Sequence, residues 1–274
     1  ILLLIIVVSS CLLPDAGKGI EFLLKPDFGK VDRNVFLNAL GQSFYSMSIG
    51  MGCICTYASY FSRQTNLLKS AIQISAIDLI VAVLAGLMIF PAAFSVGISP
   101  DSGPSLIFIT LPNVFNEAFA SMPVLGWIIS LMFYVLLSVA ALTSLMSLHE
   151  VNTSFFYEEL KIDRKKGAAI VTVACAIIGA FCSLSLGATD KLSFGGKALF
   201  DWFDFVTGQL FLPTGGLLTC LFLGWYVPKK VVQDEFTNWG TLKGKVFYVY
   251  LFLIKFVCPV LIFLVFLNQF GVFG

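Results

Sequence analysis

Long apolar stretches alternate with short polar connections along this chain of 274 residues. A membrane span needs about 20 mostly apolar residues. The connections hold most of the Gly, Pro and charged residues. The pattern predicts one transmembrane domain over residues 1–274, with a partial span followed by six complete ones, at 1–13, 36–61, 68–96, 122–156, 167–188, 199–227 and 246–270.

The composition supports a membrane protein. Hydrophobic residues make up 58% of the chain and charged residues only 12%, which leaves too little polar surface for a soluble domain of this size. The net charge of +1 is spread along the chain, so we expect no nucleic-acid partner. Ile1 begins an apolar run that lacks the features of a signal peptide, and we interpret it as the inside of a membrane helix whose N-terminal part is missing.

The basic residues predict how the domain is oriented. If the connection at 62–67 is cytoplasmic, the connections on that side and their edges hold ten Lys and Arg residues, against six on the other side. The connection at 97–121 has none. Because cytoplasmic loops carry an excess of Lys and Arg, this bias places 97–121 and the C-terminus outside.

The middle of the span at 36–61 reads GQSFYSMSIGMG, which is rich in Gly and Ser. Gly50 and Gly52 flank one bulky residue, and each lowers helix propensity by about 1 kcal/mol. An opened backbone survives in hydrocarbon only where it lines a cavity or is buried in protein. The segment therefore favours a helix broken near 48–52, with carbonyls free to bind a cation and N–H groups free to bind a substrate. A Gly/Ser surface for close helix packing is an equally good interpretation of this pattern.

Other polar residues lie in the middle of apolar spans. A carboxylate such as Asp78 costs a few kcal/mol there, so we expect it to face a cation, a polar partner or water. Thr143 and Ser144 offer hydroxyl oxygens of the kind that hard cations bind, although hydrogen bonds to their own helix explain them more simply. Glu150 needs a buried partner, and His149 is interpreted as a hydrogen-bonded helix residue.

Several motifs occur in the order and approximate spacing of the neurotransmitter:sodium symporter family, namely GQSFYSMSIGMG, TYASYF, GPSLIFITLPNVF, ALTS and EELKIDRKK. The chain resembles the bacterial sodium-dependent hydrophobic amino-acid transporters of that family. The resemblance implies an all-α polytopic membrane protein with the leucine-transporter-type inverted-repeat fold. The chain would supply the second repeat, helices 6–10, together with helix 11 and the end of helix 5. Residues 97–121 would form the extracellular cap loop.

The resemblance also implies two sodium sites, each completed by the missing N-terminal half. Ser46 and Asp78 match ligands of the first site, where the family usually has Asn at the position of Asp78. The carbonyl of Ala140 and the hydroxyls of Thr143 and Ser144 match the second site. Chloride-dependent members carry a hydroxyl residue at the position of Ala82, so we expect transport without a chloride requirement.

Further residues match the family's substrate pocket and gates. The residues implied for the substrate pocket are Tyr45, Ser46, Ser48, Met51, Ser144 and Leu148. Asp204 matches the acidic member of the extracellular gate. Glu158 matches the acidic member of the cytoplasmic gate, and Tyr60 lies beside it. Because Met is unbranched and flexible, the pocket can adapt to larger side chains, so Met51 favours bulky hydrophobic or aromatic L-amino acids.

The expected function is sodium-coupled amino-acid symport by alternating access in the bacterial inner membrane. The sequence has no Ser/His/Asp arrangement, no His cluster and no nucleotide-binding loop, so we expect no enzyme. Two alternatives stay open. One is a proton-coupled carrier on the same fold, with Asp78, His149 or Glu150 as its titrating group. The other is a truncated product without transport activity of its own.

Overall fold

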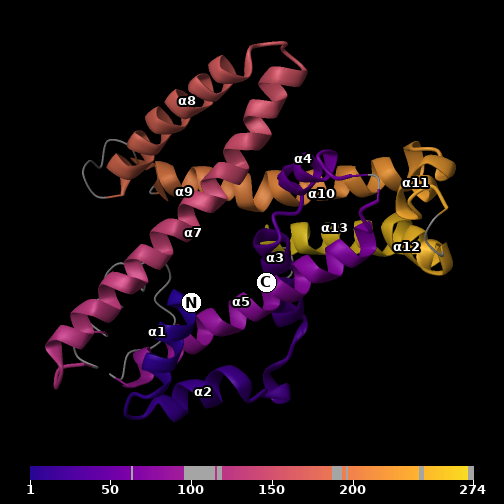
Figure 1. The fold of residues 1–274 in the computed structure, drawn as a ribbon. Helices are drawn as coiled ribbons and strands as arrows, with labels where there is room; N and C mark the ends of the chain where they lie inside the picture. The colour runs from indigo at the N-terminus through magenta and orange to yellow at the C-terminus, as the bar shows by residue number, and fades with distance from the viewer. Residues whose placement is uncertain are drawn as a thin grey trace. The chain divides into compact units, whose positions relative to one another are not determined.

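The computed structural model describes residues 1–62, 64–95, 115, 119–186, 193–195, 197–240 and 244–270. The expected cap loop at 97–121 lies outside these residues, except for Phe115 and 119–121. Helices dominate the described chain (Figure 1). It forms two compact units, one of residues 1–31 and 74–144 and the other of residues 32–73 and 145–274.

Five helical stretches in the described residues are long and apolar enough to cross a membrane. They are α5 (Leu67–Ser95), α7 (Pro123–Glu158), α8 (Arg164–Ser185), the stretch Leu199–Tyr226 and the stretch Phe247–Gln269. Most of their side chains are exposed within the structure and apolar, as for helices that face lipid. The prediction of an all-α polytopic membrane protein is confirmed.

The first unit is built around the N-terminal helices and α5. It contains α1 (Leu2–Cys11), α2 (Ala16–Leu24), the 3-10 turn η1 (Phe28–Lys30) and residues 74–95 and 123–144 of the long helices. The helices α1 and α2 meet at a bend of 113° and are long and apolar enough to cross a membrane only as a pair. The Phe22 ring lies 5.2 Å from that of Phe90, and a Cβ on Gly19 would lie 2.6 Å from the backbone of Phe90. This contact holds α2 directly against α5.

The second unit carries most of the residues predicted to be functional. It begins with α3 (Arg33–Ser46) and α4 (Cys53–Ser59) and includes α8 and residues 145–158 of α7. The strands β1 (Ser193–Phe194) and β2 (Lys197–Ala198), of two residues each, form an antiparallel hairpin in which Ser193 pairs with Ala198. The remaining elements are α9 (Leu199–Asp204), η4 (Phe205–Phe211), α10 (Leu212–Leu221), η5 (Phe222–Tyr226), α11 (Lys229–Phe236), η6 (Gly244–Val246), α12 (Phe247–Phe252), η7 (Leu253–Val257) and α13 (Cys258–Gln269).

Two of the apolar stretches contain π-helical turns. The stretch Leu199–Tyr226 includes the π-helices η4 and η5, and Phe247–Gln269 includes η7. Such widened turns inside α-helices are frequent at functional sites. In this unit α10 packs against α13 and α3, with Leu212, Ile262 and Val265 buried between them.

Candidate functional site

The helix that the sequence predicted to be broken is interrupted between Ser46 and Cys53. The amide of Ile49 donates to the carbonyl of Phe44 at 3.0 Å, and the amide of Ser48 donates to that of Tyr45 at 3.1 Å. Ser48 has a left-handed backbone, with φ of 52°. These are the bonds of a Schellman motif, in which a left-handed residue ends a helix. Glycine is the usual residue there, so a serine in this conformation stores strain of the kind that gathers at functional sites.

Two glycines complete the interruption. Gly50 and Gly52 have φ of 87° and 83°, and Gly52 caps the start of α4. A Cβ on Gly50 would lie 2.4 Å from the carbonyl oxygen of Leu212, and one on Gly215 would lie 2.7 Å from the carbonyl oxygen of Gly50. Both interpretations of this segment, a broken helix and a surface for close helix packing, therefore apply to Gly50. Gly50 turns the chain in a conformation that other residues avoid, and it also lets two backbones touch.

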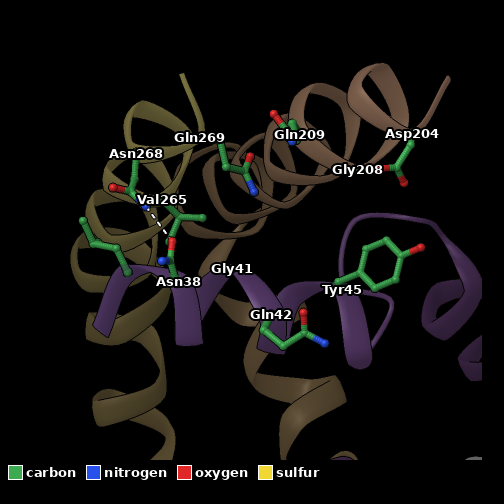
Figure 2. A pocket seen from close by; sticks show the side chains of 11 residues that line it. Asn38, Gly41, Gln42, Tyr45, Asp204, Gly208, Gln209, Val265, Asn268 and Gln269 are labelled. Atoms are coloured by element: carbon green, nitrogen blue, oxygen red, sulfur yellow. Dashed lines mark hydrogen bonds between the residues drawn. The ribbon is translucent and has the colours of Figure 1, made fainter. Parts of the chain in front are cut away.

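A pocket of about 210 Å³ opens between α3, η4 and α13 in the second unit (Figure 2). Tyr45 and Asp204 lie at one end of it, and Asn38 and Asn268 at the other. The side-chain nitrogen of Asn268 donates to the amide oxygen of Asn38 at 2.9 Å. Five carboxamide residues line this pocket, which are Asn38, Gln42, Gln209, Asn268 and Gln269. Such groups both donate and accept hydrogen bonds, so the pocket suits a polar guest or water.

Of the residues that line this pocket, Tyr45 and Asp204 were predicted from the sequence to be functional, and the carboxamides were not. A usable signal was present, since Asn38 and Gln42 are four residues apart and so share one face of α3. The side-chain oxygen of Gln269 is buried and has no hydrogen-bond partner among the described residues. A buried polar atom of this kind calls for a partner, and water or a ligand in the pocket could supply one.

A second polar cluster joins α4, α7 and α8. The hydroxyl of Tyr60 donates to Glu150 at 2.8 Å and lies 3.0 Å from the hydroxyl of Ser154. Arg164 donates to the same carboxylate oxygen of Glu150 at 2.6 Å. The side chain of Glu150 is 22% exposed and that of Arg164 is 60% exposed. Arg164 and Tyr60 are thus partners of Glu150, although both are exposed and not buried as the sequence predicted.

The predicted cytoplasmic gate residue Glu158 lies in a separate hollow, lined also by Tyr157 and Lys161. Tyr60 does not have a described hydrogen bond to Glu158. Its described hydrogen bonds go to Glu150 and Ser154, which lie two turns and one turn before Glu158 on α7. His149 lies between the hydroxyls of Thr172, at 2.9 Å, and Thr153, at 3.2 Å. This hydrogen bonding agrees with its interpretation as a structural helix residue.

In the first unit, one turn of α7 carries the residues predicted for the second sodium site. The hydroxyl of Thr143 donates to the carbonyl of Ala140 at 2.8 Å, within an uninterrupted helix. Ser144 is the next residue and is exposed. A carbonyl and two neighbouring hydroxyls form a set of hard oxygen donors, which fits an alkali cation. Asp78, which is half-buried, belongs to α5 in the same unit, whereas Ser46 and the other residues around the interruption belong to the second unit.

The remaining predicted substrate residues belong to the second unit and vary in exposure. Ser48 and Met51 are half-buried in the interruption, and Ser46 is exposed at the end of α3. Tyr45 is 53% exposed beside the carboxamide pocket, and Leu148 on α7 is 42% exposed. Only Tyr45 of this set lines the pocket in Figure 2.

Comparison with known proteins identifies the class. The model of the sodium:neurotransmitter symporter family matches residues 1–273, and the chain belongs to this family. It is 35% identical, over 99% of its length, to the uncharacterized sodium-dependent transporter YhdH of Bacillus subtilis, and 32% identical, over 98%, to an uncharacterized sodium-dependent transporter of Haemophilus influenzae. It covers 59% and 57% of those two proteins.

A solved structure supports the same assignment. The crystal structure of MhsT in complex with L-phenylalanine matches this chain with a TM-score of 0.84 and 34% sequence identity. The match covers 98% of this chain and 59% of the MhsT chain. The chain therefore spans about three-fifths of the length of these relatives. The family and the apolar helices together make it a multi-pass membrane protein with a transporter fold.

Proposed function

We propose that this chain is part of a symporter that uses sodium to drive amino-acid uptake by alternating access. The interruption between Ser46 and Cys53 carries this proposal, since α3 and α4 would form one broken span. Backbone groups released from a helix at membrane depth must line a cavity or be buried in protein. The carbonyls and amides of such a break are the groups that transporters offer to a cation and to the charged ends of a substrate.

The sodium ligands follow from the family resemblance and from the chemistry of the residues. Ala140, Thr143 and Ser144 would supply the second site with three oxygens from one turn of helix. Ser46 and Asp78 would contribute to the first site, where the carboxylate of Asp78 adds a negative charge that the usual Asn lacks. The proposal includes an upstream half that completes both sites, in keeping with the three-fifths coverage of the relatives.

The substrate we propose is a bulky hydrophobic or aromatic L-amino acid. Met51 lies between two glycines in the interruption, where its flexible side chain could adapt to different apolar groups. The L-phenylalanine bound in the crystal structure of MhsT supports this class of substrate. Unlabelled L-Trp, L-Phe or L-Leu should compete with labelled L-Phe better than Gly or Ala does. Stronger competition by Gly would contradict the proposed pocket.

The gates extend the proposal to both sides of the membrane. Asp204, beside the carboxamide pocket, would close the outer side with a basic partner from the upstream half. Glu158 would serve on the cytoplasmic side. The bonds of Tyr60 to Glu150 and Ser154 suggest that this neighbouring cluster holds the end of α4 in place.

Chloride independence is part of the proposal, because Asp78 can supply the negative charge that chloride provides in other members. Uptake measured after chloride is replaced by gluconate should be unchanged. A large loss of uptake would show that Asp78 does not supply this negative charge.

The decisive functional experiment measures uptake of labelled L-Phe into proteoliposomes. A sodium gradient should drive uptake by the chain joined to its upstream half, and the chain alone should transport nothing. A proton gradient without sodium should be ineffective. Uptake driven by pH alone would favour the proton-coupled carrier, and sodium-driven uptake by the chain alone would remove the need for an upstream half.

A further inference from the structure

Three lysines and two aromatic residues gather where the stretches Leu199–Tyr226 and Phe247–Gln269 meet the helix α11. The ammonium of Lys255 lies 5.3 Å from the ring centroid of Trp225, and that of Lys229 lies 4.5 Å from the ring centroid of Tyr248. Lys230 follows Lys229 in the first turn of α11 and is exposed. All five residues belong to the second unit.

Lys255 is the only charged residue in Phe247–Gln269, about two turns into that stretch. A lysine there is costly unless its head group reaches a polar partner or the membrane interface. Its backbone is held closely. The indole N–H of Trp225 donates to the carbonyl of Lys255 at 3.3 Å, and a Cβ on Gly224 would lie 3.1 Å from the Cγ of Lys255. Trp225 and Lys255 therefore form a fixed pair across the π-helices η5 and η7.

The position of α11 is fixed as well. The ring of Phe236 stacks on that of Tyr250 at 4.9 Å and lies 5.6 Å from that of Phe247, while Val232 is buried. These contacts join α11 to α12 and bring Lys229 over the ring of Tyr248. The two lysine–aromatic pairs thus lie on connected elements, because α12 continues into η7 and η5 packs against η7.

The three ammonium groups are available to an anion. Lys18, Lys25 and Arg164 form salt bridges with Asp15, Glu21 and Glu150, whereas within the described residues no salt bridge involves Lys229, Lys230 or Lys255. Asp234 lies four residues after Lys230 on α11 and so shares a face with it, but among the described residues no salt bridge joins the two. A lysine above an aromatic ring is attracted by the ring quadrupole and still has N–H donors to offer.

We propose that Lys229, Lys230 and Lys255, with Trp225 and Tyr248, form a binding site for the head group of an anionic phospholipid. The phosphate would be held by the ammonium groups, and the acyl chains would lie on the apolar helix surface beside them. Trp225 and Tyr248 are 60% and 65% exposed, and Phe252 on the same surface is 58% exposed. Aromatic residues of this kind sit at head-group level. The excess of basic residues places this end of the spans on the cytoplasmic side, where basic clusters bind anionic lipids.

Native mass spectrometry of the chain in neutral detergent tests the site. With equal amounts of phosphatidylglycerol and phosphatidylcholine, the chain should bind the anionic lipid preferentially. Replacing one lysine of the proposed site should weaken phosphatidylglycerol binding about fivefold. The double variant Lys229→Gln/Lys230→Gln should therefore lose about 25-fold, and Lys255→Gln about fivefold. Lys255→Arg, which keeps the charge, should retain binding even if Lys255→Gln folds poorly.

The matched control is Lys165→Gln/Lys166→Gln, which removes the same charge from the exposed start of α8. Its phosphatidylglycerol binding should be unchanged. An equal loss in both double variants, or equal binding of the two lipids, would overturn the proposal. Glycerol phosphate, which is the head group without chains, should not displace the lipid at tenfold excess. Full displacement would show that the site takes a free phosphate rather than a lipid.

Discussion

Two regions predicted to bind sodium present their oxygens in opposite ways. Around residues 46–53 the helix is broken, and Ser48, Gly50 and Gly52 turn the backbone with positive φ angles. Around residues 140–144 the helix α7 is uninterrupted, and the donors are the hydroxyls of Thr143 and Ser144 with the carbonyl of Ala140. The first region depends on a backbone conformation and the second on side-chain chemistry. Substitutions should therefore affect folding in the first region and ion affinity in the second.

The largest expected effect is that of Gly50→Ala. A side chain at φ of 87° costs about 1–2 kcal/mol, and the new Cβ would lie 2.4 Å from the carbonyl oxygen of Leu212. Overpacking of this kind costs about 1–3 kcal/mol more. We expect a much lower midpoint of thermal unfolding in detergent.

The control for this variant is Gly179→Ala. Gly179 lies in α8 with an ordinary helical backbone, and no heavy atom beyond its chain neighbours and its own helix backbone lies within 4 Å of the position that its new methyl group would take. This substitution should stabilise the chain by up to about 1 kcal/mol. Equal midpoints of thermal unfolding for the two variants would mean that the turn at Gly50 is not held against α10.

The next effect is that of Thr143→Val, which removes a predicted sodium ligand from an intact helix. Stability should change by less than about 0.5 kcal/mol, as for most surface substitutions. The sodium concentration for half-maximal uptake should rise about tenfold. Thr219→Val is the matched control, because Thr219 makes the same kind of bond to its own helix, 2.8 Å to the carbonyl of Gly215, and is not a predicted ligand. A similar rise in both would remove Thr143 from the sodium site.

A smaller effect is expected where the second half of the broken helix meets α7. Glu150→Gln should lower the free energy of unfolding by about 1 kcal/mol, because Glu150 accepts from both Tyr60 and Arg164. Arg164→Gln should cost less, since its side chain is 60% exposed and the pair is screened by solvent. Chemical unfolding in mixed micelles measures both. A greater loss with Arg164→Gln would show that the ion pair, rather than the Tyr60 bond, fixes this end of α4.

The smallest effect concerns the first half of the broken helix. Asn38 on α3 is joined to Asn268 on α13 by one hydrogen bond. Hydrogen bonds between membrane helices contribute about 0.6 kcal/mol on average. A double-mutant cycle with Asn38→Leu and Asn268→Leu should give a coupling energy of that size. A coupling energy of zero would mean that the two side chains are each satisfied independently.

The sequence predicted the class of fold because long apolar runs leave few alternatives to membrane helices. For the Gly-rich segment around Met51 it left a broken helix and a surface for close packing equally open, and in the structure α3 ends at Ser46 while α4 starts at Cys53. The contact of Gly50 with α10 was beyond its reach, because the partner is more than 160 residues away. The same holds for the carboxamide pocket, where Asn38 meets Asn268. The partners of Tyr60 also depended on which turn of α7 lies nearest, and a motif does not specify this.

One measurement tests the central claim most directly, which is that the broken helix and the hydroxyl turn act together with sodium to bind an amino acid. It is equilibrium binding of labelled L-Phe, in sodium and in potassium at equal ionic strength, by the chain joined to its upstream half. Binding should require sodium and should weaken in Thr143→Val but not in Thr219→Val. Equal binding in sodium and potassium would contradict the account.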